Sequence, residues 1–415
     1  MRGQRWVVVA DSPFLPANGG GEAEHVGFVR CCVEAGVLAA LVVPTDADPS
    51  RYGRADDLQA IREMIAPAAL ILTPRRRTAL SVVQGRTPYP VASRPVPRSL
   101  VRDVRAAAPD ANGVVGFSYR SHRVAGALAR GLGVPAVMRM HNLEGRYFHS
   151  LAGAKPRWAA WAVHLEATRI DLDERLLERA SWVNGLADIS RTDALERQRR
   201  TRTRVAHVPT FVVARAGVQP DVRWQPGAEQ EVLFLGALDV PTNHEALDWL
   251  CERVWPAVRQ RVPSAVLTIA GRRPTEGVRR LVEQTPGARL LPDIADPRAM
   301  MARCSVAVNP AVTGSGVNIK LVEYLDVGAP VVSTALGAQA LSLRDGSELL
   351  IRDDPEAFAE AICELLTNRE RAAAIGAAGG RAAAALREGA TGLDLIAQLL
   401  GHGQDRHGRT PGGAA

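Results

Sequence analysis

Residues 309–334 read Asn309-Pro-Ala-Val-Thr-Gly-Ser-Gly-Val-Asn-Ile-Lys-Leu-Val-Glu-Tyr-Leu-Asp-Val-Gly-Ala-Pro-Val-Val-Ser-Thr334, which predicts a strand, a loop, a helix and a second strand. Glycines at 314 and 316 allow the loop backbone to approach a ligand closely. The start of a helix exposes unpaired N–H groups and a partial positive charge, which suit a diphosphate. Lys320 would add a mobile positive charge, and Glu323, three residues later, could accept hydrogen bonds from ribose hydroxyls.

Lysine is rare in this chain. Of the 51 basic residues, only Lys155 and Lys320 are lysines. A lysine that persists against this bias towards arginine indicates a chemical role. The alternative is an ordinary strand–loop–helix unit in which Lys320 and Glu323 face solvent. The scarcity of lysine and the ending Gly328-Ala-Pro-Val-Val332 favour the diphosphate site.

The alternation of strand and helix extends outward in both directions. Strands are predicted at 6–11, 37–44, 69–73, 113–118, 136–141, 182–186, 231–237, 265–270, 288–292, 305–309, 330–334 and 348–352. The pattern fails between Phe211 and Gln230, where two prolines and two glycines predict an interdomain linker. Two such halves predict a double Rossmann arrangement. Ligands bind at the carboxyl ends of parallel strands, so we expect the active site in the crevice between the halves.

The segment 309–334 resembles the donor-binding motif of retaining GT-B glycosyltransferases, specifically glycosyltransferase family 4. Glu323 and the Gly-Ala-Pro-Val-Val ending match the second half of that motif, and Ser315 occupies the place of its first glutamate. The spacing from Gly316 through Lys320 resembles a subgroup with Gly-x-x-x-Lys-x-x-Glu. The resemblance covers nearly the whole chain and is strongest across 231–340.

The resemblance implies an α/β fold of the GT-B type, with two Rossmann-like domains that face a central crevice. The expected parts are an N-terminal acceptor domain at 1–215, a nucleotide-sugar donor domain at 226–385, a helix at 386–400 that returns to the N-terminal domain, and a disordered tail at 401–415.

Donor-binding residues also follow from the resemblance. Those in the second domain are Gly236, Asn243, Arg272, Ile294, Gly314, Ser315, Gly316, Val317, Asn318 and Glu323, and those in the first are Gly20 and Gly21. Some of these have simpler explanations. The two glycines of the first domain could form a flexible turn, and Asn243 could only cap a helix, because residues 242–245 match a capping box. Arg272 could belong, with Arg273, to a solvated helix start.

His141 and Lys320 are the expected catalytic residues. His141 lies in the stretch Met138–Glu144, which resembles the His-Asn-x-Glu stretch of the family, although a histidine at a strand end is often structural. The family mechanism implies that Lys320 stabilises the leaving diphosphate, and it requires neither a metal nor a cofactor. The stretch from Asp188 to Ser190 would orient other groups or cap a helix.

The composition narrows the partners. The net charge is +7 and the pI is about 9.6, which fits anionic ligands such as nucleotide sugars or an acidic membrane surface. No nucleic-acid-binding motif is present. The five cysteines show no metal or disulfide pattern, and no apolar run is long enough to span a bilayer. A cytoplasmic location is expected, with a peripheral contact at the inner membrane face left open.

Three basic segments lie outside the motifs described above. The segment Arg146–Trp161 mixes cations and aromatics and could touch an acceptor or a membrane, although an arginine-decorated helix with core tryptophans is the simpler interpretation. The runs Arg75–Arg77 and Arg197–Arg204 are expected to be solvated faces.

The expected activity is retaining transfer of a sugar from a nucleotide-diphosphate sugar to an unidentified acceptor, such as a natural product, a glycan or a lipid-linked sugar. The alternatives are a nucleotide-sugar epimerase or hydrolase of the same fold, and a non-catalytic nucleotide-sugar-binding partner protein.

Overall fold

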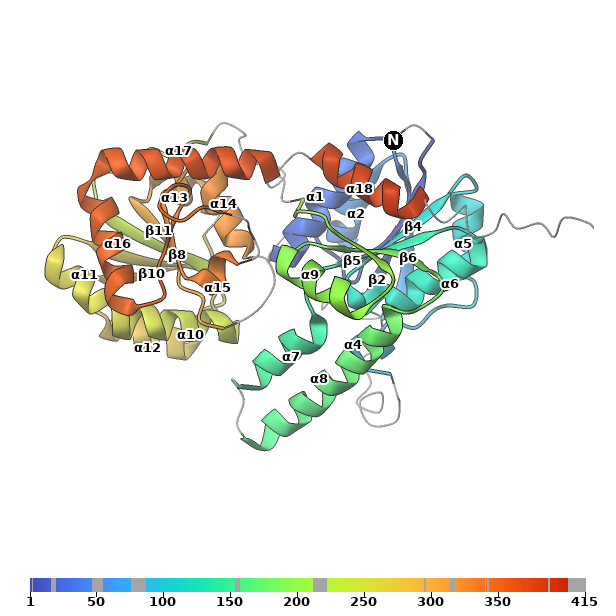
Figure 1. Ribbon diagram of the computed structural model, residues 1–415, viewed down its shortest axis with the longest axis horizontal. Coiled ribbons are helices and arrows are strands. Elements are labelled where there is room, and N and C mark those ends of the chain that lie inside the picture. The colour runs from blue at the N-terminus through green and yellow to red at the C-terminus, as the bar shows by residue number, and fades with distance from the viewer. Residues whose placement is uncertain are drawn as a thin grey trace, which may run out of the picture. The chain divides into compact units, whose positions relative to one another are not determined.

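The computed structural model describes residues 1, 3–15, 20–46, 55–75, 87–153, 157–211, 222–294, 296–313, 318–339, 341, 343–386 and 389–401. Residues 212–221 of the predicted linker, the predicted tail beyond Gly401 and the loop residues Gly314, Ser315, Gly316 and Val317 lie outside these ranges. The chain divides into two compact units, each with its own sheet (Figure 1). Unit 1 comprises Met1–His149, Ala162–Phe211 and Glu388–Ala415; unit 2 comprises Ser150–Trp161 and Val212–Arg387.

Unit 1 is built on a seven-stranded sheet in the order β3-β2-β1-β4-β5-β6-β7, in which every pairing is parallel. The strands are β1 (Trp6–Val9), β2 (Leu38–Asp46), β3 (Ala69–Arg75), β4 (Gly113–Phe117), β5 (Ala136–Met140), β6 (Val183–Asp188) and β7 (Arg204–His207). The helices are α1 (Gly20–Glu34), α2 (Ala55–Ile65), α4 (Tyr89–Ala92), α5 (Leu100–Ala107), α6 (His122–Leu132), α7 (Glu144–Gly153), α8 (Arg157–Leu177), α9 (Arg191–Arg200) and α18 (Gly389–Gly401). The end of α7 from Ser150 and the start of α8 up to Trp161 are assigned to unit 2.

The last helix belongs to the core of unit 1. In α18, Leu393, Ile396 and Leu399 are buried in the same apolar cluster as Trp6 and Phe28. The helix contacts α1, β5 and β6. Burying these side chains against the sheet removes apolar surface from water, which holds the C-terminal helix in place.

Unit 2 is built on a six-stranded parallel sheet in the order β10-β9-β8-β11-β12-β13. Its strands are β8 (Glu231–Ala237), β9 (Val266–Arg272), β10 (Ala288–Pro292), β11 (Val306–Asn309), β12 (Val331–Ser333) and β13 (Leu350–Ile351). Its helices are α10 (Pro241–Trp249), α11 (Trp255–Arg261), α12 (Glu276–Gln284), α13 (Pro297–Arg303), α14 (Ile319–Val327), α15 (Ala335–Ala338), α16 (Pro355–Thr367) and α17 (Arg369–Leu386), and a π-helical turn at Leu250–Val254 joins α10 to α11.

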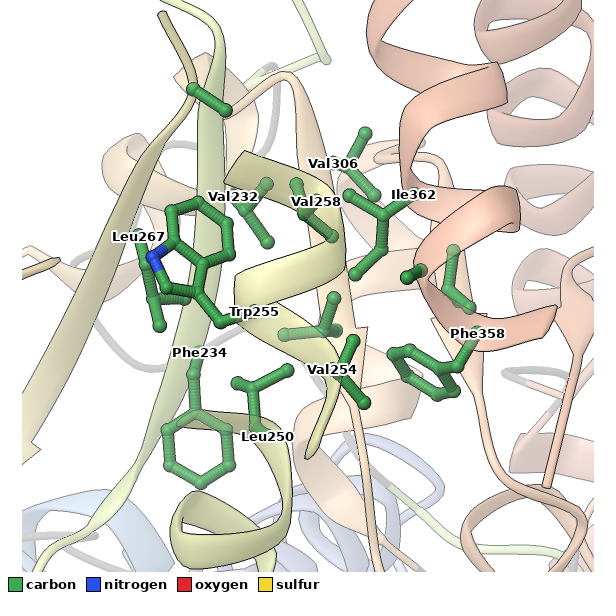
Figure 2. Packing of buried hydrophobic residues seen from close by; sticks show 14 of the residues in the cluster. Val232, Phe234, Leu250, Val254, Trp255, Val258, Leu267, Val306, Phe358 and Ile362 are labelled. Atoms are coloured by element: carbon green, nitrogen blue, oxygen red, sulfur yellow. The ribbon is translucent and has the colours of Figure 1, made fainter. Parts of the chain in front are cut away.

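Apolar side chains from the strands and helices of unit 2 interlock in its core. Figure 2 shows Leu250 and Val254 between the strand residue Phe234 and the α16 residue Phe358, with Trp255 beside Leu267. Trp224 also belongs to this unit, because its backbone N–H donates to Val327 O (2.7 Å) and its indole donates to Cys304 O (2.8 Å). The described residues of unit 2 therefore begin ahead of the expected boundary at 226.

In both sheets the strand order reverses direction beside the first strand, between β1 and β4 in unit 1 and between β8 and β11 in unit 2. Ligands of doubly wound sheets bind outside the carboxyl ends of the strands at such a reversal. The loops that follow these four strands are therefore where a site is expected. Within the described residues, no helix is long and apolar enough to cross a membrane.

Candidate functional site

Lys320 lies in the first turn of α14, at the carboxyl-end side of the unit 2 sheet. Its Nζ donates to Asn243 Oδ1 (3.0 Å) and lies 4.2 Å from the centre of the buried Phe234 ring. Burial lowers the pKa of Lys320 to about 7, and it forms no ion pair with any carboxylate among the described residues. A bound anion would favour the charged form of such a lysine.

Asn243 and Gly236 hold this lysine in place. Asn243 Nδ2 donates to Ala237 O (2.9 Å) while its Oδ1 accepts from Lys320. A Cβ on Gly236 would lie 3.0 Å from Asn243 Nδ2, so glycine leaves room for the amide. The structure thus brings three of the predicted site residues together, and Asn243 does more than cap a helix. Their role in donor binding stays a prediction.

The first turn of α10 anchors the surrounding loops. The helix begins at Pro241, and Val240, its N-cap residue, makes no side-chain cap hydrogen bond. The predicted capping box at 242–245 is therefore wrong, because a proline already occupies the first helical position. Glu245 instead accepts a hydrogen bond from Thr313, the residue before the undescribed loop, and His244 Nε2 lies 2.7 Å from Leu238 O.

Asn318 and Glu323 flank Lys320 along the chain. Asn318 is the N-cap residue of α14, and its side chain donates to Gly337 O (3.1 Å) instead of capping its own helix. This bond joins the start of α14 to α15. Glu323 is half-buried on α14, three residues after Lys320.

Arg272 ends β9, and Ile294 follows the neighbouring strand β10. Arg272 is the last residue of β9 and pairs in register with Ala237. The alternative of a solvated helix start is wrong, because α12 begins at Glu276 with Thr275 as its cap, and Arg273 Nη2 pairs with Asp239 Oδ2 (2.9 Å).

Ile294 follows β10 and packs, half-buried, against the apolar cluster that includes Leu321 and Met301. Gly271, the residue before Arg272, lies very close to the backbone of β8. A Cβ there would lie 1.7 Å from Gly236 O, so only glycine fits. This close approach joins the ends of β8 and β9.

A buried polar pair that sequence reasoning missed lies at the ends of β11 and β12. Asn309 Nδ2 donates to Ser333 Oγ (3.1 Å), and Asn309 Oδ1 has no hydrogen-bond partner among the described residues. A buried acceptor without a partner is costly, so it usually has a function or a bound molecule. This pair could have been predicted from the sequence, because a polar residue ends each of the two apolar runs 306–309 and 331–333.

His141 lies directly after β5 in unit 1. Its ring centre is 5.3 Å from that of Phe117 and 5.4 Å from that of His25, both in edge-on geometry. Its Nε2 is buried and finds no hydrogen-bond partner among the described residues. Burial and the charge of His25 lower the pKa of His141 to about 4. The imidazole is therefore neutral near pH 7.

A second histidine, His25 on α1, links this ring to Gly21 at the start of the same helix. His25 Nδ1 lies 2.7 Å from Gly21 O, and its Nε2 lies 3.3 Å from Asp11 Oδ1. Ser118 Oγ donates to Asp11 Oδ2 (2.6 Å). Burial alone would raise the pKa of Asp11, but the hydrogen bond and charge of His25, together with Arg94 and Arg120, hold it well below its usual range.

Gly20 and Gly21, which sequence analysis assigned to substrate contact, form the first residues of α1. A Cβ on Gly21 would meet no atom of the described residues within 4 Å. The structure brings Gly21 and His25 together through one hydrogen bond. No sequence motif signalled His25, because its partner Asp11 lies on another element.

A buried ion pair supports the end of β5. Arg139 is fully buried and donates to Glu24 Oε1 (Nε, 2.8 Å) and to Pro209 O (2.8 Å). Glu24 also accepts from Phe211 N (2.6 Å). The pair joins α1, β5 and the last described residues before the linker. A charged residue inside the apolar run 136–140 was the signal for it.

The basic run Arg197–Arg204 was expected to be solvated, which is wrong for Arg197. This side chain is fully buried; its Nε donates to Asp188 (3.1 Å to each oxygen), its Nη2 donates to Glu174 (3.0 Å), and its Nη1 donates to Glu178. Burial raises the pKa of Glu174 to about 7 and that of Asp188 to about 6. Arg197 also donates to Asn142 O (3.3 Å), so this cluster supports the residue next to His141.

Residues 229–368 match the model of the family described as glycosyl transferases group 1. A phosphatidyl-myo-inositol mannosyltransferase of Mycobacterium leprae is 34% identical over 169 residues, 38% of this chain and 44% of that protein. A protein of Klebsiella pneumoniae named as an uncharacterized 44.6 kDa protein in the cps region is 28% identical over 144 residues, 33% of this chain and 37% of that protein. The chain thus spans less than half the length of these curated relatives.

Among the solved structures that resemble nearly the whole chain are two with known names. Anabaena HepE in complex with UDP-glucose superposes with a TM-score of 0.65 at 13% identity, covering 96% of this chain and 99% of that one. The sucrose-phosphate synthase of Thermosynechococcus elongatus superposes with a TM-score of 0.64 at 15% identity, covering 95% and 98%. The two parallel sheets and these neighbours show that the chain has the α/β fold of GT-B proteins, with two Rossmann-like units.

Proposed function

We propose that the chain is a glycosyltransferase that moves a sugar from a nucleotide-diphosphate donor to an acceptor, and that unit 2 holds the donor. The observation that carries this proposal is Lys320, a partly buried ammonium group at the reversal of the sheet whose hydrogen-bond partner within the described part of the chain is a neutral amide. The group 1 match across residues 229–368 supports it.

In this proposal the chemistry is bond cleavage at the sugar with departure of a nucleoside diphosphate. Negative charge develops on the phosphate oxygens as the bond breaks. Lys320 and the N-terminal turn of α14 would stabilise that charge, because they are positioned before the reaction begins. The acceptor oxygen would form its bond to the sugar carbon on the same face that the diphosphate leaves, so that the configuration of the sugar is retained. The leaving phosphate would take the acceptor proton, so that no strong enzyme base is needed.

We assign to His141 a contact with a substrate hydroxyl. The neutral ring has one nitrogen that can accept and one that can donate, and its buried Nε2 has no partner among the described residues. A neutral imidazole can position a hydroxyl without adding a charge. Neither a metal nor an organic cofactor has a part in this proposal.

Nucleotide binding is expected to take up a proton at alkaline pH. The pKa of Lys320 is lowered to about 7, so above that pH the free protein holds it neutral, and a bound diphosphate would restore its charge. Affinity should therefore fall as pH rises from about 7 to about 9, while proton uptake rises towards about one per nucleotide. Calorimetry of uridine, guanosine and adenosine diphosphates in buffers of different ionisation enthalpy measures both.

The matched control for this titration is Lys320→Met, which keeps much of the side-chain volume without the titratable group. Protons exchanged by the phosphate itself cancel in the comparison. Equal proton uptake by the two proteins at about pH 8 would contradict a contact between Lys320 and the diphosphate.

Glu323→Gln is expected to weaken nucleoside diphosphate binding by ~1–3 kcal/mol, the scale for losing a partly buried hydrogen bond to a charged group. The reason is that Glu323 would accept hydrogen bonds from ribose. Pyrophosphate lacks the ribose, so its affinity should not change. Wild-type affinity of the variant for every nucleoside diphosphate that the parent binds would refute the assignment.

A further inference from the structure

The first turn of α10 holds the chain on both sides of residues 314–317, which themselves lie outside the described ranges. Glu245 accepts a hydrogen bond from the hydroxyl of Thr313, on the side of β11. Asn243 accepts one from Lys320 Nζ (3.0 Å), on the side of α14. Side chains two positions apart on a helix point to different sides of it. One helical turn therefore holds Thr313 and Lys320 through separate contacts.

The short helix α15 holds the same two stretches of chain. Thr334, its N-cap residue, donates to Ala311 O (2.6 Å) and accepts from Gly337 N (3.1 Å). Gly337 O in turn accepts from the side chain of Asn318 (3.1 Å), the N-cap residue of α14. The residues ahead of 314–317 and the residues after them are thus each bonded to α10 and to α15. The start of α14 is therefore positioned by contacts from two other elements.

Helix α10 is itself fixed to the core of unit 2. Ala246 and Leu247 are buried in the apolar cluster of that unit, and Pro241 near the start of the helix sets the backbone angle there. His244 Nε2 lies 2.7 Å from Leu238 O, which ties the same turn to the end of β8. Side chains on packed helices keep their positions more precisely than side chains on loops. The first turn of α10 is therefore suited to position the groups bonded to it.

We propose that Glu245 is a positioning residue for Lys320. Its bond to Thr313 fixes the turn from which Asn243 holds the ammonium group. The contribution of Glu245 is geometric, because no carboxylate of the described residues forms an ion pair with Lys320. The consequence for the reaction rests on the proposed function, in which the place of Lys320 sets the rate. A displacement of about 1 Å can cost a factor on the order of 10² in rate.

The scarcity of lysine gives a direct test of the geometry by nuclear magnetic resonance. In the full chain grown with lysine isotope-labelled at Cε, one signal is expected from Lys155 and one from Lys320. The Phe234 ring should shift the Lys320 signal, because Nζ lies 4.2 Å from the ring centre. Thr313→Val and Glu245→Leu should each move this signal and leave that of Lys155 in place. Thr313→Ser and Glu245→Gln keep the hydroxyl and an acceptor oxygen, so they should restore its position.

Turnover tests the consequence for the reaction. Thr313→Val and Glu245→Leu should each lower kcat by a factor on the order of 10–10², with little change in KM for the donor, because a displaced group costs the transition state more than the bound substrate. The double variant should be no slower than the slower single one, since both changes remove the same hydrogen bond. Asp248→Asn is the matched control, because Asp248 is exposed on the same helix, and it should behave as the wild type in both measurements.

Thermal unfolding by circular dichroism checks that each variant is folded. A Lys320 signal that stays in place in Glu245→Leu would overturn the proposal, and so would losses of turnover that multiply in the double variant. Full turnover in Glu245→Leu beside a slow Lys320→Ala would overturn the positioning role and leave the proposed function intact. Full turnover in both of these variants would contradict the proposed function, and the position of the Lys320 signal would then decide the proposal alone.

Discussion

Lys320→Ala is expected to lower turnover by a factor on the order of 10²–10³, the scale for removing one preorganised group that stabilises developing charge. In the free protein the ammonium group is held by Asn243 and the Phe234 ring without a carboxylate partner among the described residues. Its charge is therefore available to the leaving diphosphate. The loss should appear in kcat, because the charge on the diphosphate grows as the transition state is reached. Steady-state kinetics with a competent donor measures it.

Two variants separate this role from general effects. Lys155→Ala removes the only other lysine of the chain and should leave turnover unchanged. Lys320→Arg keeps the charge on a planar, bulkier group and should not restore full activity, because the contacts with Asn243 Oδ1 and the Phe234 ring fit a compact ammonium group. An unchanged kcat/KM in folded Lys320→Ala would remove Lys320 from the mechanism.

Arg197→Leu is expected to lower the free energy of unfolding by about 3–5 kcal/mol, the cost of breaking a buried ion cluster by removing one partner. The variant would leave Glu174, Glu178 and Asp188 buried around an apolar side chain. Urea unfolding followed by circular dichroism measures the loss. Arg199→Leu is the matched control, because Arg199 lies on the same helix but is exposed. A loss for Arg197→Leu no larger than that for Arg199→Leu would contradict the account of this cluster.

The loss of unfolding free energy in Arg197→Leu should depend on pH in a defined direction. The folded-state pKa values of Glu174 and Asp188 are raised to about 7 and about 6, so protonation stabilises the folded state as pH falls through that range. Removing Arg197 raises both pKa values further, because its charge lowers them in the wild type. The deficit of the variant should therefore be greatest at about pH 8 and shrink towards about pH 5.

The fold class followed from the sequence because it depends on local patterns. Apolar runs flanked by glycine and proline marked the strands, and the α/β fold of the GT-B type is confirmed. The strand β7 was missed, and the helices α2, α5 and α9, which lack a strong apolar pattern, were given no bounds. In α9 the arginines hid the pattern, since one of them is a core residue whose partners lie on other elements.

The candidate site was only partly predictable, for a related reason. Asn243 and Lys320 were named from their own segments, but the hydrogen bond between them joins residues 77 positions apart. His25 was not named, although it sets the electrostatics around His141, because sequence spacing does not show which side chains meet beneath a sheet edge. Periodicity also could not show that Trp161 on α8 is 64% exposed, so the simpler interpretation of its segment, with the tryptophans in the core, is wrong for Trp161.

The roles of the site residues stay predictions, and so does a peripheral membrane contact. The loop Gly314–Val317, which sequence analysis placed against the donor, lies outside the described residues. The functional proposal therefore rests on the geometry around Lys320 and on the group 1 match across residues 229–368.

Release of nucleoside diphosphate from a panel of nucleotide-diphosphate sugars, with mass spectrometry of the products, tests the central claim most directly. The panel is offered with and without natural products, glycans and lipid-linked sugars as acceptors, and Lys320→Ala is the blank. The account predicts that at least one donor releases nucleotide faster with an acceptor present, that the acceptor gains the mass of one sugar, and that the blank is slower by a factor on the order of 10²–10³. Isomerised donor without transfer, acceptor-independent hydrolysis, tight binding without release, or equal rates in the two proteins would contradict it.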